Sequence, residues 1–387
     1  MFSDAVMPDL PRQAAPICYQ INLQRSLGGG EIYTRFFSDA LLASGWEYKL
    51  VVVRGAIFWR ELGLDPRRMV EITDGAQLPS VLPDKSCLVV THNVIGEDLA
   101  REIGQRHTLA GVLHMPLYER DLIGLHYYDQ LFAVSGHVLS SMRTKGLTNA
   151  YPAPIYAVAD IASRDASRDS EIVKRSRYDW DRRKWRDRLF SVLEPLQRLL
   201  ASKQAYAKRP GLTLGIVSRL TPIKQFPLLS SILVPHLVRL PNVNLEIFGN
   251  GGYASVRDLR KALAPLGDRV RFWGHQSNVR LAYESVDFIL SGLPEKEALG
   301  LNLIEAQACG TPVIAIDAPP FNETVLDGVS GYLYADPRKD DGAAFAALMQ
   351  RLLAGEARLR PLDAAAHLQR FSVAAFNQRV ARALPTY

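Results

Sequence analysis

Two carboxylates on either side of a glycine are the residues of this chain best suited to chemistry. Glu297 and Glu305 stand eight positions apart, and Gly300 lies between them where a helix is expected to begin. Glu305 would lie on that helix and Glu297 on the loop before it. Backbone N–H groups at a helix N-terminus bind anions, and a carboxylate can accept hydrogen bonds from both hydroxyl groups of a ribose. Taken alone, the pair also fits a surface Glu beside a helix-start Glu.

Two cations occupy a loop upstream of these carboxylates. Arg219 and Lys224 are five positions apart and directly follow an expected strand. A cation pair on a strand-end loop suits a diphosphate that gains negative charge as it leaves. Gly249, Gly251 and Gly274 follow the next two expected strands and predict tight turns at the same edge of the sheet.

Histidines end two expected strands of the first half. His114 follows 109–113, and His92 follows 87–91. Ligands of open α/β sheets bind beyond the carboxyl ends of the strands, so either imidazole could face a ligand. A histidine after a strand is also commonly structural. The other six histidines have no comparable placement.

Short apolar runs alternate with amphipathic stretches through both halves of the chain. The strands expected from this pattern are 17–23, 48–53, 87–91, 109–113, 130–134, 212–217, 245–248, 270–273, 288–290 and 312–315. The helices expected between the later strands are 226–240, 253–266, 278–283 and 301–309. The alternation predicts an α/β protein with two Rossmann-like lobes, each built on a mostly parallel sheet, that face a cleft.

The expected lobes are joined by an unusual segment. The first lobe would span 1–205, with a basic inter-lobe segment at 160–205, and the second lobe would span 206–370. A terminal helix within 371–387 carries an apolar stripe of Ala375, Phe376, Val380 and Leu384. We expect this helix to cross back and pack on the first lobe, which would couple lobe closure to ligand binding.

Ten basic and six acidic residues lie within 164–188, with Trp180 and Trp185 among them. One interpretation is a solvated helix whose apolar stripe packs at the lobe junction. The other is an interfacial basic helix, Arg164 to Arg188, that contacts an anionic membrane surface. The nearby acids dilute the positive field, which favours the first interpretation.

The composition and charge of the chain limit the classes of protein to which it can belong. The 387 residues carry 46 Lys and Arg against 40 Asp and Glu, a net charge of +6, and 48% are hydrophobic. These values are typical of soluble globular proteins, and no apolar run approaches the ~20 residues of a membrane span. No secretory signal is expected at the N-terminus, and three cysteines without a CxxC pair argue against a disulfide scaffold. We therefore expect a cytoplasmic protein, with no nucleic-acid partner.

In their order along the chain, these motifs resemble the retaining glycosyltransferases of family 4, which have the GT-B fold. The resemblance covers most of the second lobe and thins in the first, where it rests on 28–31, His114 and 129–135. The matching pieces of the second lobe are Ser218-Arg219-Leu220 with Lys224, 245–251, 269–274, 297–313, and Asn322-Glu323-Thr324-Val325 leading to Gly328 and Gly331.

The resemblance implies a role for each second-lobe residue. Glu305 would hold the ribose hydroxyls of a nucleotide-sugar donor, and Glu297 would contact its sugar ring. Arg219 and Lys224 would bind the diphosphate. The remaining donor-binding positions of this lobe would be Gly249, Gly251, Leu299, Gly300 and Leu301.

The first lobe would contribute from the other side of the cleft. Gly29 and Gly30 would approach the diphosphate, and His114 would lie near the sugar and its developing oxocarbenium charge. His92 is the competing candidate for that histidine. The departing diphosphate could take the acceptor proton, so no dedicated base is implied.

The catalytic set implied by the resemblance is thus His114, Glu297, Arg219 and Lys224, with no metal and no cofactor, because the nucleotide-sugar is a substrate. Asp179-Trp180-Asp181 has the DxD spacing of metal-dependent transferases. It stands among arginines in the inter-lobe segment, where a structural role is the more expected one.

The resemblance implies a hexosyltransferase that acts on a glycan or lipid-linked acceptor in bacterial surface polysaccharide or lipopolysaccharide assembly. The location that goes with this role is the cytoplasm, at the inner face of the membrane. Ala-Leu-Gly follows Glu297 where the family more often has Gly-Phe-Gly, a change that bears on the sugar pocket. The alternatives are a nucleotide-sugar epimerase of the same fold and a non-catalytic carbohydrate- or nucleotide-binding protein. Dehydrogenase, P-loop and serine-hydrolase motifs are absent from the sequence.

Overall fold

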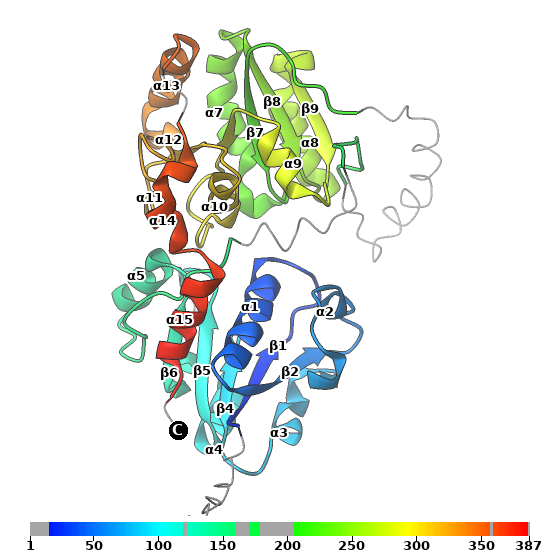
Figure 1. Cartoon of the computed structure of the whole chain (residues 1–387), viewed down its shortest axis with the longest axis vertical. Coiled ribbons are helices and arrows are strands. Elements are labelled where there is room, and N and C mark those ends of the chain that lie inside the picture. The colour runs from blue at the N-terminus through cyan, green and yellow to red at the C-terminus, as the bar shows by residue number, and fades with distance from the viewer. Residues whose placement is uncertain (1–14, 119–121, 160–169, 179–204, 357–358, 386–387) are drawn as a thin grey trace, which may run out of the picture.

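The chain folds into two α/β lobes, each built on a six-stranded parallel sheet (Figure 1). The computed structural model describes residues 15–118, 122–159, 170–178, 205–356 and 359–385. The predicted fold class, two Rossmann-like lobes of GT-B type with a C-terminal helix that returns to the first lobe, is confirmed.

The first lobe has the strand order β3-β2-β1-β4-β5-β6. Its strands are β1 Ile17–Asn22, β2 Glu47–Val53, β3 Met69–Ile72, β4 Leu88–Thr91, β5 Thr108–Leu113 and β6 Gln130–Ala133. Its helices are α1 Gly29–Ala43, α2 Phe58–Glu61, α3 Leu78–Val81, α4 Glu97–Arg106 and α5 Gly136–Thr144. The strand order reverses direction between β1 and β4, which is where a sheet of this kind opens a crevice at its carboxyl edge.

The second lobe repeats this plan with the order β12-β11-β10-β7-β8-β9. Its strands are β7 Leu212–Val217, β8 Val243–Phe248, β9 Val270–Gly274, β10 Phe288–Leu290, β11 Val313–Ile316 and β12 Gly331–Tyr334. Its helices are α7 Phe226–Val238, α8 Tyr253–Leu263, α9 Val279–Glu284, α10 Leu301–Ala308, α11 Phe321–Thr324, α12 Pro337–Asp340, α13 Ala343–Leu353 and α14 Ala365–Gln369.

Each lobe has its own hydrophobic core. All residues of β4 and β8 are buried, because helices cover both faces of a parallel sheet and leave no solvated side. The expected helix over 253–266 ends at Leu263 and gives way to a 3₁₀ segment, Ala264–Arg269, in which Gly267 leaves the helical region with φ 59°. The edge strands β3 and β12 were not predicted from the sequence. Both are four residues long, and β3 has only one buried residue.

The last helix, α15 Val373–Ala383, lies along α1 of the first lobe (Figure 1). Phe376, Val380 and Ala383 belong to the first lobe's core, and Ser372 caps the helix by accepting a hydrogen bond from the Ala375 N–H at 3.2 Å. The chain therefore ties the two lobes together at its C-terminal end as well as through the inter-lobe segment.

A second tie between the lobes forms at the start of α5. The Glu323 carboxylate, from the second lobe, accepts hydrogen bonds from the N–H groups of Gly136 at 2.8 Å and His137 at 3.0 Å, and from the Tyr156 hydroxyl at 3.1 Å. A carboxylate at a helix N-terminus is stabilised by the helix dipole and by the otherwise unpaired N–H groups. The Ser135 hydroxyl also donates to the Ala298 carbonyl at 2.5 Å.

Most of the predicted basic segment, including Trp180, Trp185 and Asp179-Trp180-Asp181, lies outside the described residues. Within it, 170–178 is described and packs on the second lobe, where Ile172 is buried in the core. No helix of the described ranges is both long enough and apolar enough to cross a membrane.

Candidate functional site

The two predicted cations lie on the loop that leaves β7 at its carboxyl end. Backbone hydrogen bonds hold this loop against the turn after β8: the Ser218 N–H donates to the Phe248 carbonyl at 3.1 Å, and the Leu220 N–H donates to the Asn250 carbonyl at 2.8 Å. The backbone on either side of Arg219 therefore continues the pairing of β7 with β8 beyond the ends of the two strands. Lys224 follows in a short 3₁₀ turn, Pro222–Lys224, before α7.

Two glycines make this backbone pairing possible. A Cβ atom on Gly249, where φ is +145°, would lie 1.9 Å from the Ser218 carbonyl oxygen, and one on Gly251 would lie 2.0 Å from that of Leu220. No side chain fits at either distance. Gly249 and Gly251 were predicted as donor-binding residues, and the structure gives them a defined positional task, to let the cation-bearing loop approach.

Lys224 forms an ion pair with Glu297. Both side chains are largely but not completely shielded from water, with 25% and 16% exposure. Glu297 reaches Lys224 from the loop between β10 and α10, so the carboxyl edges of two neighbouring strands, β7 and β10, supply the two charges. An ion pair of this kind fixes the position of the ammonium group relative to the loop that carries Glu297.

The start of α10 lies where the sequence predicted it. Gly300 is the N-cap and has φ 77°, a left-handed conformation, and a Cβ there would lie 3.1 Å from the Phe321 ring. The Asn302 side chain donates to the Val217 carbonyl at 3.1 Å, which fastens the first turn of α10 to the end of β7. Leu299 is buried with Tyr156, Ile304 and Phe371, and Leu301 packs beside them.

Glu305 lies on α10 and is 5% exposed. Its carboxylate accepts a hydrogen bond from the Tyr283 hydroxyl at 2.8 Å. Tyr283 lies on α9, so Glu305 is oriented by a neighbouring helix and not by its own. A buried, oriented carboxylate at this edge can accept hydrogen bonds from the hydroxyl groups of a ligand.

From the first lobe, Gly28, the N-cap of α1, approaches Arg219. A Cβ on Gly28 would lie 3.4 Å from Arg219 Nη2 and 3.1 Å from Glu31 Oε2. Nothing lies within 4 Å of a Cβ on Gly29, and a Cβ on Gly30 would lie 3.8 Å from the His114 ring. The structure thus brings Arg219, the Gly28–Gly30 turn and His114 together across the two lobes.

Glu31 is a site residue to which the sequence analysis gave no role. It is 5% exposed in the first turn of α1. Burial raises its pKa, while hydrogen bonds from the backbone at Glu31 and Gly28 and from Asn22, and the charge of Arg219, act in the opposite direction. The sequence did contain a signal for Glu31, because an acidic side chain in the first turn of a helix lies in the positive field of the helix N-terminus, where a bound anion would also lie. Its approach to Arg219 depends on the other lobe.

The two candidate histidines are neighbours, with ring centroids 5.9 Å apart. His92 is 2% exposed, and its Nε2 shares a hydrogen bond with Gln20 Oε1 at 3.0 Å. His114 is partly exposed, and its buried Nε2 has no hydrogen-bond partner in the described part of the chain. Of the two, His114 borders Gly30 and the cleft, whereas His92 is packed inside the first lobe.

Burial governs the charge of both rings. It lowers the pKa of His114 to about 4, and it lowers the pKa of His92 well below its ordinary value, with His114 adding to the shift. Both imidazoles are therefore neutral near pH 7. A neutral His114 can donate or accept a hydrogen bond but does not add positive charge to the site.

The second lobe contains a match to a known protein family. The family model described as "Glycosyl transferases group 1" matches residues 211–355. This part of the chain is similar to that family, and residues 211–355 are called the group 1 domain below. Arg219, Lys224, Glu297 and Glu305 all lie within it, whereas His114 and the Gly28–Gly30 turn lie outside it.

A curated protein to which the chain is similar is the D-inositol 3-phosphate glycosyltransferase of Mycobacterium marinum. It is 33% identical over 167 residues, which cover 41% of this chain and 34% of the relative. The chain thus matches about a third of the length of the curated relatives.

Solved structures match almost the whole chain around the group 1 domain. The crystal structure of Anabaena Alr3699/HepE in complex with UDP and glucose has a TM-score of 0.69 at 18% identity, covering 95% of this chain and 99% of that one. The lipopolysaccharide outer core galactosyltransferase WaaB, in its apo form, has a TM-score of 0.59 at 17% identity, covering 95% and 98%. At these identities the likeness establishes the two-lobed fold.

Proposed function

We propose that this protein is a retaining glycosyltransferase that moves a sugar from a nucleoside-diphosphate sugar to a glycan or lipid-linked acceptor. The observation that carries the proposal is the ion pair between Lys224, which follows β7, and Glu297, which follows the neighbouring strand β10. Arg219 lies on the same loop as Lys224, Glu305 lies on the helix after Glu297, and all four residues are within the group 1 domain. These residue types suit a diphosphate, a sugar and a ribose.

In the proposed complex, Arg219 and Lys224 bind the diphosphate. Lys224 exchanges Glu297 for a phosphate oxygen, which frees the Glu297 carboxylate to accept hydrogen bonds from the sugar hydroxyls. Glu305, already oriented by Tyr283, accepts from the ribose. HepE is similar in fold and was crystallised with UDP and glucose, which supports a ligand of this class for the present chain.

Further donor contacts come from backbone at the same edge and from the other lobe. The start of α10 adds N–H groups at Leu299, Gly300 and Leu301. Gly249 and Gly251 act by seating the loop that carries Arg219, because their own N–H groups already donate to the Gly274 and Arg177 carbonyls. Gly29, whose surroundings are open, and Gly30 approach the diphosphate from the first lobe. His114 lies next to Gly30 and is proposed to contact the sugar.

The proposed reaction breaks the bond between the anomeric carbon and the diphosphate oxygen and forms a bond from that carbon to the acceptor hydroxyl oxygen on the same face. The acceptor proton passes to the departing diphosphate. Arg219 and Lys224 stabilise the negative charge that grows on the leaving group, where fixed cations contribute most. No protein base is required, and the proposal includes no metal or other cofactor.

The proposal places the enzyme in the cytoplasm, at the inner face of a membrane, in the assembly of bacterial surface polysaccharide or lipopolysaccharide. WaaB, which shares the fold, is a lipopolysaccharide galactosyltransferase, and this supports the choice of acceptor class. The predicted basic segment, 164–188, would contribute contact with anionic lipid.

A thermal-shift screen of nucleoside diphosphates and their sugars tests the donor proposal, since a ligand that binds only the folded protein raises the melting temperature. The matching donor is then incubated with the protein, with and without candidate acceptors. We expect transfer to the acceptor with the anomeric configuration kept. A rearranged sugar released from donor alone would instead identify an epimerase, and binding without any turnover would identify a non-catalytic protein.

A further inference from the structure

A second cationic group lies on the outer flank of the second lobe, away from the cleft. It borders a pocket of about 620 Å³ along the edge strand β9, which we call the flank pocket. The residues that line it are Lys174, Arg177, Arg260, Lys261, Leu263, Ala264, Gly267, Asp268, Val270, Arg271, Phe272 and Trp273. None belongs to the first lobe, and the pocket reaches Gly267 and Asp268, which precede β9 and so lie at the opposite end of that strand from the cleft.

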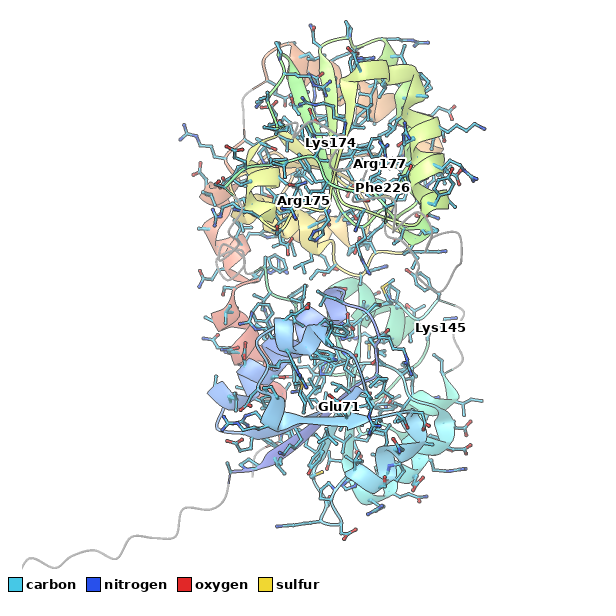
Figure 2. All side chains as sticks on the ribbon, turned by 90° about the vertical axis from the view of Figure 1, so that its right-hand side faces the viewer. Glu71, Lys145, Lys174, Arg175, Arg177 and Phe226 are labelled. Atoms are coloured by element: carbon cyan, nitrogen blue, oxygen red, sulfur yellow. The ribbon has the colours of Figure 1, made fainter. Side chains whose placement is uncertain are left out.

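A strap of the inter-lobe segment, residues 172–178, brings two of the cations to this edge. The Arg175 N–H donates to the Trp273 carbonyl at 2.8 Å, and the Gly251 N–H donates to the Arg177 carbonyl at 3.1 Å. Lys174 and Arg177 are thereby held beside β9, and Figure 2 shows them on one side of the second lobe. The described part of the predicted basic segment thus contributes directly to the flank pocket.

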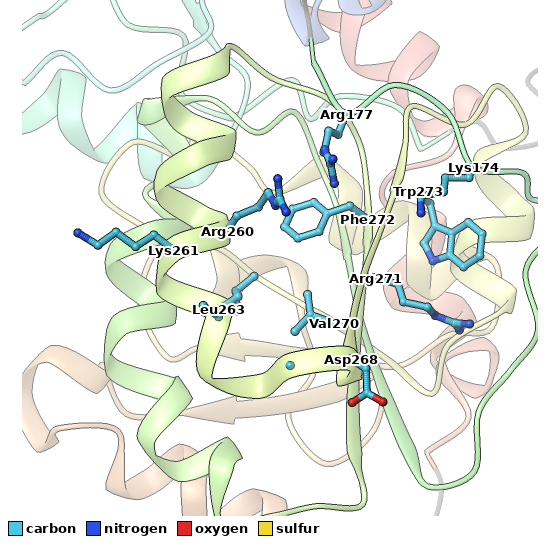
Figure 3. A pocket seen from close by; sticks show the side chains of 12 residues that line it. Lys174, Arg177, Arg260, Lys261, Leu263, Asp268, Val270, Arg271, Phe272 and Trp273 are labelled. Carbon is cyan, nitrogen blue, oxygen red and sulfur yellow. The ribbon is translucent and has the colours of Figure 1, made fainter. Parts of the chain in front are cut away.

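Arg177 and Arg260 extend toward each other near Phe272 (Figure 3). One comes from the strap and the other from α8. Arg257, on the same helix, is paired with Asp258 at 2.8 Å, whereas no carboxylate among the described residues forms an ion pair with Arg177 or Arg260. The Asp268 side chain points away from both (Figure 3).

The other residues that line the flank pocket indicate which kind of ligand it suits. Arg271 is committed to the buried carboxylate of Glu246, which also accepts from Trp273 Nε1 at 2.7 Å and forms an ion pair with Arg209 at 2.9 Å. Arg271 therefore supports the wall and does not supply free charge. Leu263, Val270 and Phe272 add apolar surface beneath the two arginines. A guanidinium fork matches two oxygens of a phosphate, and a pair of forks matches a phosphate better than a carboxylate.

We propose that the flank pocket binds a phosphate-bearing anion, with Arg177 and Arg260 as the groups that contact the phosphate. The ligand is either the head group of an acidic phospholipid, whose apolar part would meet Leu263, Val270 and Phe272, or a soluble phosphate compound. This inference does not depend on the glycosyltransferase proposal, because the flank pocket shares no lining residue with the cleft.

Binding is measured with two probes on the full chain. Flotation with phosphatidylcholine vesicles, with and without phosphatidic acid, tests the lipid source, and calorimetric titration with inorganic pyrophosphate tests the soluble one. The variants are Arg177→Ser/Arg260→Ser, the matched control Arg257→Ser from the same helix, and Lys224→Ala, which removes a cation of the cleft. Arg177→Lys/Arg260→Lys keeps the charge and tests the charge requirement if the serine variant fails to fold.

We expect the wild-type protein to bind at least one probe, and the double serine variant to bind it roughly 30-fold more weakly, as for the loss of two cations that face an anionic surface. Arg257→Ser should retain that binding. Lys224→Ala should retain the vesicle binding, and with pyrophosphate it should lose only the share bound by the cleft and keep the share that Arg177→Ser/Arg260→Ser loses. Arg177→Lys/Arg260→Lys should bind more tightly than the double serine variant and more weakly than the wild type, because an ammonium keeps the charge but lacks the two-oxygen fork. The probe that binds identifies the source. The proposal is overturned if the wild type binds neither probe, if Arg177→Ser/Arg260→Ser binds as tightly as the wild type, or if binding is lost only in Lys224→Ala.

Discussion

The cations of the cleft and those of the flank pocket lie in the same lobe but in opposite surroundings. Lys224 pairs with Glu297, and Arg219 lies beside Gly28 and near Glu31 of the other lobe. On the flank, no described carboxylate pairs with Arg177 or Arg260. A paired cation is held in place before its ligand arrives and must exchange partners, whereas a cation without an acid partner gains its first counter-charge from the ligand.

The two groups are joined by one glycine turn. Gly251 lies against the Leu220 carbonyl of the cleft loop, and its N–H donates to the Arg177 carbonyl of the strap. The turn after β8 therefore positions both groups, although each faces a different ligand. The comparison predicts that changes at the charges separate the two functions and that changes at the turn affect both.

The largest effect is expected at the cleft charges. Lys224→Ala should lower turnover by about 10²–10³-fold, because a fixed cation at the leaving group is lost. Glu305→Ala should also cause a large loss, through the ribose contact. Both are measured as steady-state kinetics with the donor identified by thermal shift, on folded protein. Lys339→Ala, an exposed cation on α12, is the control and should be close to wild type. Near-normal rates in either cleft variant would contradict the site assignment.

The next largest effect is expected at the glycine turn after β8, which positions both groups of cations. Gly251→Ala should destabilise the protein by about 2–3 kcal/mol, since its Cβ would lie 2.0 Å from a backbone oxygen that cannot move without disturbing the loop. Urea unfolding measures the loss, and nucleotide and flank-ligand binding should both weaken. Gly252→Ala is the matched control, because nothing lies within 4 Å of its Cβ. Equal stability of the two variants would show that the turn does not require glycine.

The tie between the lobes should matter to the cleft and not to the flank. Glu323→Gln keeps an acceptor for α5 but loses the charge that faces the helix N-terminus, and should cost about 1 kcal/mol. We expect a higher KM for the donor, because the cleft needs both lobes, with vesicle or pyrophosphate binding at the flank unchanged. Glu284→Gln removes an exposed carboxylate from an i,i+4 pair and should be near neutral. A matching shift in the control would remove the special role of Glu323.

The smallest effect concerns His114 and pH. Its pKa falls from an ordinary 6.5 to about 4 in the folded protein. The unfolded chain therefore binds more protons between those values, so stability is complete above pH 6.5 and declines as pH falls toward 4. From pH 7.5 to 5.5 the loss due to His114 should be about 1 kcal/mol. Unfolding free energies of wild type and His114→Gln at both pH values measure it. An identical pH dependence of the two proteins would show that His114 is not shielded from water.

Much of the fold could be predicted because local patterns of apolar residues and glycines determine its strands and helices. Buried parallel strands such as β11, Val-Ile-Ala-Ile, read as continuous apolar runs, and α10 follows its N-cap Gly300 where the sequence indicated. The edge strands β3 and β12 escaped prediction because each is only four residues long, and β3 is also largely solvated.

The candidate site likewise has a part that the sequence predicts and a part that depends on the tertiary structure. The sequence by itself determined which strand ends carry Arg219, Lys224 and Glu297, because each lies in a segment that follows a strand, and it determined that Glu305 lies on the helix capped by Gly300. Only the tertiary structure decided that Lys224 and Glu297 pair, that Glu31 approaches Arg219, that His92 is interior while His114 borders the cleft, and that the strap brings Arg177 to Arg260. These are contacts between segments far apart in the chain, and they depend on how two lobes and a crossing segment pack, which no local pattern encodes.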